Sequence, residues 1–208
     1  MGNRVNRKRG QAEEPKKWAA EIAGVSWMAG GLILLLSQLS YSPADLPEWS
    51  IFDLFADTGE ADGENWLGPV GGILAFLQIL VFGAAGWIFS LGFIWFGVLK
   101  LAFKSRLWPR ITLGHAVALV TGAVFLHAAG IFFAEWAARC NLSGRPGGVI
   151  GQALGGSLLM PVIGKAGTIA LSATAYLLGM IWLAGQTPAD FAKGCHRLLK
   201  AKIDAWKE

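Results

Sequence analysis

Few side chains of this 208-residue sequence stand in a pattern that chemistry requires. Gly164 and Lys165 resemble the end of a phosphate-binding loop. That loop needs a glycine five residues earlier and a hydroxyl directly after the lysine, but Leu159 and Ala166 occupy these positions. Segment 58–69 has the length of a calcium-binding loop, yet neither its first nor its last residue is a carboxylate. We therefore expect no nucleotide site and no metal site.

Two histidines, His115 and His127, fall in one long apolar run. A helix separates them by about 120° around its axis, so they do not share a face. The apolar runs hold no carboxylate that could partner them, because Glu21 and Glu135 stand near the ends of runs. We expect a polar packing contact for His127, with a haem ligand or proton relay as the alternative. Catalytic residues and cofactors are not expected, and the role of Lys165 stays open.

The composition excludes an ordinary soluble domain. Hydrophobic residues make up 54% of the chain and charged residues only 15%, and 28 further residues are glycine. The mean hydropathy is +0.47. A soluble domain has about a quarter charged residues and could not cover so much apolar surface. The sequence therefore predicts a membrane protein.

Four apolar runs are long enough to cross a bilayer core of about 30 Å, which takes about 20 helical residues. The predicted spans cover residues 20–40, 82–103, 111–133 and 166–184. The basic segment 1–17 before the first span is also typical of a signal peptide, but no A-x-A-like site follows that span.

Two apolar blocks, 66–103 and 148–184, are too long for one crossing and cramped for two. We expect each to begin with a short interfacial or re-entrant helix, at 69–80 and 148–160. The tail, 187–208, has apolar residues every three to four positions with lysines and arginines between them, which predicts a basic amphipathic helix. The predicted fold class is an all-α membrane protein with four transmembrane helices, two short helices and this C-terminal helix.

Basic residues predict the orientation. The N-terminus, the loop at 100–110 and the tail carry six, four and five Lys or Arg residues, whereas the acidic loop 42–65 has none and the loop 134–147 has two. The positive-inside rule therefore places both termini in the cytoplasm. Cys140 and Cys195 then lie on opposite sides and cannot pair within one chain, so we expect free thiols, or a disulfide between two copies at Cys140.

Glycines mark an internal repeat and the expected packing faces. The pair Gly68 and Gly71 returns 80 residues later, and the pair Gly83 and Gly86 returns 81 residues later. Small residues also form a stripe along the third span. Because glycine lets helix backbones approach closely in lipid, we expect a helix-packing or oligomer interface at these positions: Gly68, Gly71, Gly83, Gly86, Gly114, Gly122, Gly130, Gly148, Gly151, Gly164 and Gly167.

Several short blocks carry a resemblance to a known family. They begin at Leu39, Asn65, Gly147 and Gly164, and read LSYSPAD, NWLGPVG, GGVIG and GKAGTIAL. In order and spacing they are similar to the N-terminal four-helix membrane domain of the FtsK/SpoIIIE DNA translocases, over about residues 18–186. The resemblance implies a domain of the bacterial inner membrane that reaches the division septum, oligomerises and supports the division machinery. Direct nucleic-acid binding is not implied for this chain.

The motor that usually follows this domain is not recognisable in the sequence. No Walker motif, long linker or winged-helix DNA reader is present, so the 208 residues are either a part of a longer translocase or a stand-alone homologue. We expect an anchoring and assembly domain with no enzyme activity of its own. The alternatives are a small transporter or channel, which the broken apolar blocks suggest, and a haem- or quinone-binding protein that uses His127.

Overall fold

The computed structural model describes residues 3–42, 46, 65–103, 108–130, 146–185 and 193. All regular secondary structure in these residues is helical, and four of the helices are long and apolar enough to cross a membrane. The candidate spans are Trp18–Leu39, Gly68–Ala102, Pro109–Ala129 and Gly148–Leu183. This confirms the predicted class, an all-α protein with four candidate membrane spans.

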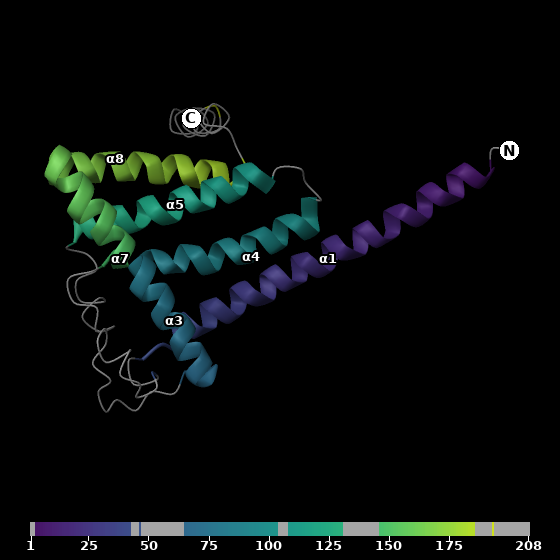
Figure 1. Ribbon diagram of the computed structural model, residues 1–208, viewed down its shortest axis with the longest axis horizontal. Helices are drawn as coiled ribbons and strands as arrows, with labels where there is room; N and C mark the ends of the chain where they lie inside the picture. The colour runs from purple at the N-terminus through teal and green to yellow at the C-terminus, as the bar shows by residue number, and fades with distance from the viewer. Residues whose placement is uncertain are drawn as a thin grey trace, which may run out of the picture. The chain divides into compact units, whose positions relative to one another are not determined.

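Eight helical elements make up the described chain (Figure 1). They are α1 (Asn3–Leu39), α3 (Gly68–Phe82), the 3-10 turn η2 (Gly83–Ala85), α4 (Gly86–Phe103), α5 (Trp108–Ala129), α7 (Gly148–Ile150), the π-helical segment η3 (Gly151–Leu159) and α8 (Met160–Leu183). Helices dominate because a chain inside lipid must satisfy every backbone N–H and C=O within itself.

The chain divides into two compact units. Unit 1 consists of residues 1–78 and 87–106, and unit 2 of residues 79–86 and 107–208. Unit 1 therefore contains α1, α4 and most of α3, whereas unit 2 contains η2, α5, α7, η3 and α8. Phe76 and Phe96 lie at the core of unit 1, and Ala118 and Ala123 at the core of unit 2.

Glycines with positive φ interrupt both long apolar blocks. Gly83 (φ 60°) separates α3 from α4, and Gly164 (φ 72°) kinks α8. Gly68 and Gly148, with φ of 64° and 62°, begin the two blocks. Residues with a Cβ avoid this conformation, so glycine alone lets the chain turn here without strain. The four glycines at the repeat offsets of 80 and 81 residues thus share one backbone geometry.

Two expected boundaries differ from the structure. The span predicted at 111–133 begins earlier, at Trp108, and its helix ends at Ala129, because Gly130 takes a φ of 67°. The span predicted from residue 82 has its helix α4 only from Gly86, since η2 intervenes. The placement of segments 69–80 and 148–160 at the membrane surface stays a prediction. The acidic loop 42–65, the loop 134–147 and the tail 187–208 lie almost wholly outside the described residues.

Substitution of the two break glycines tests this geometry. An ideal Cβ at Gly164 meets no atom within 4 Å, whereas one at Gly83 collides with the carbonyl oxygen of Pro146 and comes 2.5 Å from the nitrogen of Gly148. Gly164→Ala is therefore expected to cost about 1–2 kcal/mol of unfolding free energy through backbone strain alone, and Gly83→Ala more. Thermal unfolding in detergent, followed by circular dichroism, measures both.

Gly30→Ala is the matched control, because Gly30 lies within helix α1 without positive φ and a Cβ there also meets nothing within 4 Å. This variant is expected to unfold at or above the original midpoint, since alanine favours a helix. A Gly164→Ala protein as stable as Gly30→Ala would contradict the assigned strain.

Candidate helix-packing interfaces

Helices α5 and α8 of unit 2 touch at their backbones. A Cβ added at Gly114 would lie 2.6 Å from the nitrogen of Leu183 and 2.9 Å from the carbonyl oxygen of Gly179. One at Gly179 would lie 2.6 Å from the nitrogen of Ala118. Real Cβ atoms do not approach backbone so closely, so these two glycines set the separation of the helices. The small residues of α5 thus face α8 in the same chain (Figure 1).

Helices α1 and α4 of unit 1 make an equivalent contact. A Cβ at Gly97 would lie 2.6 Å from the carbonyl oxygen of Gly24, and one at Gly31 would lie 2.7 Å from the nitrogen of Ile94. Gly24 also faces Leu101. The contact order shows that the two helices run antiparallel, because the earlier glycine of α1 meets the later residue of α4.

Close backbone contact matters here because lipid is as apolar as a leucine side chain. Apolar burial therefore adds little drive for helix association, and dispersion contacts between closely approaching backbones supply it instead. A side chain as small as alanine at Gly114 or Gly97 would push the helix axes apart and weaken many such contacts at once.

Segments α7 and η3 pack on the opposite half of α5. A Cβ at Gly151 would lie 2.5 Å from the carbonyl oxygen of Ala123, and Gly147 contacts the same oxygen. Farther along, Gly155 lies against Val124. Segment η3 continues into α8 through an N–H···O bond from Met160 to Gly155, which spans five residues and gives the wider π-helical turn.

The predicted glycines divide into three groups in the described structure. Six of them would bring a Cβ within 3.4 Å of their own chain: Gly71, Gly83, Gly114, Gly148, Gly151 and Gly167. Two, Gly86 and Gly122, are buried. For Gly68, Gly130 and Gly164 an added Cβ meets nothing closer than 3.9 Å, and all three have positive φ. Their use between copies of the chain stays a prediction.

Four packing glycines were missed by the sequence reasoning: Gly24, Gly31, Gly97 and Gly179. A signal existed for two of them, because Gly24 and Gly31 are seven residues apart and so share one face of a helix. Gly97 and Gly179 stand alone in their helices, and only the partner helix shows their role.

A buried polar cluster joins the three helices of unit 1. The hydroxyl of Ser90 on α4 lies 2.8 Å from Oε1 of Gln78 on α3 and 3.2 Å from Oε1 of Gln38 on α1. All three side chains are buried, with Ser90 fully inaccessible. The amide nitrogen of Gln78 also donates to the carbonyl oxygen of Leu74, at 3.2 Å. Polar groups buried in an apolar surrounding must find partners, so this cluster selects one arrangement of the three helices.

Asn65 fastens the start of α3 to the end of α1. Its Nδ2 donates to the carbonyl oxygen of Ser37 at 2.9 Å, and its Oδ1 accepts from the backbone N–H of Leu67 at 3.0 Å. The neighbouring N–H of Trp66 donates to the hydroxyl of Ser40, at 3.1 Å. A single asparagine thus satisfies backbone groups of two elements, which the sequence reasoning did not foresee.

The residues considered for metal or proton chemistry do not assemble in the described structure. His115 is buried, whereas His127 is half-buried against η3, with its Nε2 2.7 Å from the place of a Cβ on Gly156. Among the described residues, no three His, Cys, Asp or Glu side chains lie close enough to hold a metal ion. Lys165 is exposed beside the kink at Gly164. Cys140 and Cys195 lie outside the described residues.

Four candidate spans, two antiparallel helix pairs that pack through glycine and a buried polar cluster define a polytopic membrane domain. The chain belongs to the family described as the 4TM region of DNA translocase FtsK/SpoIIIE, which it matches over residues 16–196. This is the membrane region of those translocases, and their motor is a separate part. Comparison with curated proteins and with solved structures produced no match.

Removal of the Ser90 hydroxyl tests the polar cluster. Ser90→Ala leaves a buried amide oxygen of Gln78 without this donor, which is expected to lower the unfolding free energy by about 1 kcal/mol. Ser26→Ala is the control, because that exposed hydroxyl bonds only to Ile22 of its own helix. Thermal unfolding in detergent gives both values.

The double variant Ser90→Ala/Gln78→Met separates a network from two independent residues. If the cluster acts as a unit, the two losses are less than additive, by about 0.5 kcal/mol or more. Additive losses, or equal effects of Ser90→Ala and Ser26→Ala, would show that the cluster does not hold the helices.

Proposed function

We propose that this chain is the membrane-anchoring and oligomerisation domain of an FtsK-like DNA translocase, and that it supports cell division and chromosome segregation at the septum. Family membership over residues 16–196 is the observation that carries the proposal. The four candidate spans support the anchoring role. The proposal gives these residues no part in ATP hydrolysis or in direct DNA binding.

The contacts within each unit support an assembly of preformed helix pairs. The glycines at the α1–α4 and α5–α8 contacts are used inside one copy. Sister copies then meet through other surfaces, and helix α8 offers one, because Val162 is 77% and Leu177 61% exposed. Such side chains are at home in lipid and can exchange lipid for a neighbouring helix at little cost.

The proposed orientation places both termini in the cytoplasm of a bacterium and the acidic loop 42–65 on the outer side of the inner membrane. Fifteen of the 18 basic residues lie in the three segments assigned to the cytoplasm. The acidic loop has seven carboxylates and no basic residue, so it suits contact with the outer parts of division proteins.

The two helix breaks also bear on the alternative, a small transporter or channel. Transporters use broken helices to present free backbone groups to a substrate. At Gly83, however, the chain fills the break with its own backbone: Pro146 and Gly148 lie against it, and Ala84 donates a 3.0 Å hydrogen bond to Pro146. This packing favours a structural turn, and we retain the anchoring function.

Expression of the chain fused to a fluorescent protein in a dividing rod-shaped bacterium tests the septal role. We expect a midcell band, and several bleaching steps per particle when the fusion is diluted in native nanodiscs. The same fluorescent protein on an unrelated single membrane helix is the control and is expected to show uniform membrane signal. Uniform signal for both fusions would overturn the septal role, and single bleaching steps would overturn oligomerisation.

The two native cysteines test the orientation. A maleimide that cannot cross membranes is expected to label Cys140 in intact spheroplasts and to label Cys195 only after permeabilisation. The single-cysteine variants Cys140→Ser and Cys195→Ser assign each signal. Labelling of Cys195 from outside, or of Cys140 only from inside, would contradict the proposed topology.

A further inference from the structure

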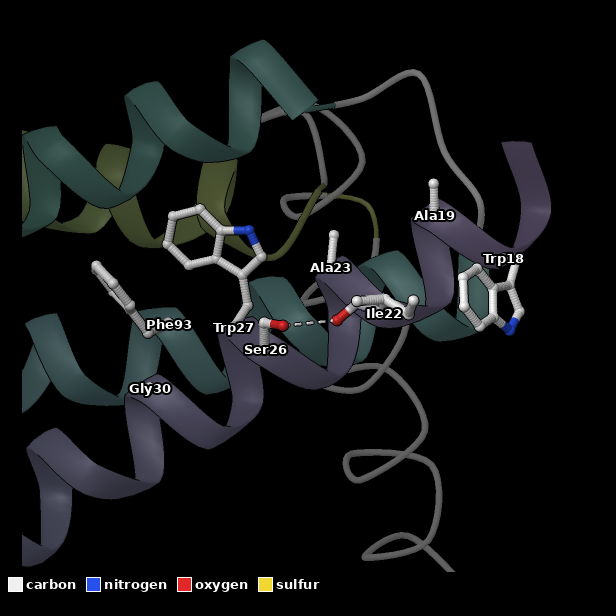
Figure 2. A pocket seen from close by; sticks show the side chains of 8 residues that line it. All are labelled: Trp18, Ala19, Ile22, Ala23, Ser26, Trp27, Gly30 and Phe93. Carbon is white, nitrogen blue, oxygen red and sulfur yellow. Dashed lines mark hydrogen bonds between the residues drawn. The ribbon is translucent and has the colours of Figure 1, made fainter. Parts of the chain in front are cut away.

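An apolar groove lies on unit 1 along the first half of the membrane-spanning part of α1 (Figure 2). Its volume is about 660 Å³, within the range of about 300–1,000 Å³ typical of small-ligand sites. On α1 it is lined by Trp18, Ala19, Ile22, Ala23, Ser26, Trp27 and Gly30, and on α4 by Phe93. The Ser26 hydroxyl turns back to the carbonyl oxygen of Ile22, at 2.9 Å, so the groove offers no free donor there.

The groove occupies a face of α1 that the unit leaves open. Gly24 and Gly31 face α4 across short distances, whereas a Cβ at Gly30 meets nothing within 4 Å. Trp27 closes the groove on the α4 side, because its ring packs edge-on against Phe93 with centroids 4.7 Å apart. Trp18, which is 69% exposed, marks the other end.

The length of the groove matches one leaflet of a bilayer. From Trp18 to Gly30 the helix rises by about 18 Å, and half of the hydrocarbon core measures about 15 Å. Tryptophan prefers the interface between headgroups and acyl chains. With Trp18 at this interface, the groove runs from the headgroups toward the bilayer centre, parallel to an acyl chain.

Basic residues continue the groove face toward the N-terminus of α1. Arg9, Lys16, Ala23 and Gly30 follow one another at intervals of seven residues, so they lie along one stripe of the helix. The acidic residues of this region take other positions around the axis, with Glu21 about 160° from the centre of the groove face. An anionic group at the Trp18 end therefore finds positive charge on the groove side of α1.

Helix α4 adds a cation on the same side. Lys100 follows Phe93 by seven residues and lies in the last turn of α4. Because the two helices run antiparallel, with Leu101 against Gly24, this turn lies toward the Trp18 end of the groove. Both helices thus place a lysine near the same end.

We propose that the groove binds an anionic phospholipid, with one acyl chain between Trp18 and Phe93 and the phosphate headgroup near Lys16 and Lys100. The acyl chain gains little by leaving the bilayer for an apolar groove, since both are apolar. Selectivity must therefore come from the charge of the headgroup, to which a lysine at the membrane surface contributes about 1 kcal/mol, or about fivefold in affinity. The proposal needs α1 to cross a membrane and does not depend on a septal role.

Photolabelling of the full purified chain in nanodiscs tests the proposal. Phosphatidylglycerol or phosphatidylcholine that carries a diazirine in one acyl chain is added at low fraction to phosphatidylcholine discs, and labelled residues are mapped by mass spectrometry. We expect phosphatidylglycerol to label Ser26, Gly30 and Phe93 severalfold more than phosphatidylcholine does. Equal labelling by the two lipids would overturn the proposal.

A pair of adjacent lysines provides the matched control. Lys16→Gln is expected to lower the phosphatidylglycerol labelling of the groove about fivefold. Lys17→Gln removes the same charge on the face that carries Gly24 and Gly31, seven and fourteen residues later, and is expected to change the labelling little. Equal losses in the two variants would show a general attraction to the surface and overturn a specific site.

Filling of the groove tests the place of the acyl chain. Gly30→Leu adds a side chain where a Cβ meets no atom within 4 Å, so the fold is expected to persist and the labelling of Ser26 and Phe93 to be lost. Unchanged labelling would place the lipid elsewhere. A second copy is the rival occupant: Gly30→Cys in a Cys140→Ser/Cys195→Ser background would then form a disulfide between copies in high yield, which would also overturn the proposal.

Discussion

The close approach of helix backbones inside lipid is the constraint on which this structure depends. Water does not drive apolar helices together within a bilayer, so association relies on contact area and on the few polar groups that can pair. Gly114 and Gly179 provide that contact in unit 2, and Gly24 and Gly97 provide it in unit 1. Each pair is antiparallel, and each sets the distance at which the remaining side chains of its helices meet.

Glycine also solves a second problem, that of chain length. Two apolar blocks of 35 and 36 residues each exceed what one straight crossing needs. Gly83 and Gly164 turn the chain with positive φ, at positions that correspond in the internal repeat. In unit 1 the cluster around Ser90 then holds three helices by hydrogen bonds, which are directional, whereas the apolar contacts of the same helices are not.

The same physical chemistry separates the inner and outer faces of α1. One face is used by the contact with α4, and the other carries Trp18, Ala23 and Gly30 around an open groove. In water such a groove would be a liability, but in a membrane the solvent itself can fill it. The anchoring domain therefore meets its lipid through a shaped surface that carries charge at one end.

The sequence by itself determined the all-helical class, the four apolar spans and the family, because hydropathy and run length follow from composition along the chain. It also located the glycines of the repeat. It predicted a helix past Gly130 and missed Gly24, Gly97 and the pairing of Ser90 with Gln78, because these depend on residues far apart in sequence. Which glycine meets a backbone, which turns the chain and which faces open space was decided only by the tertiary structure, since all three roles use the same residue and differ only in what lies opposite.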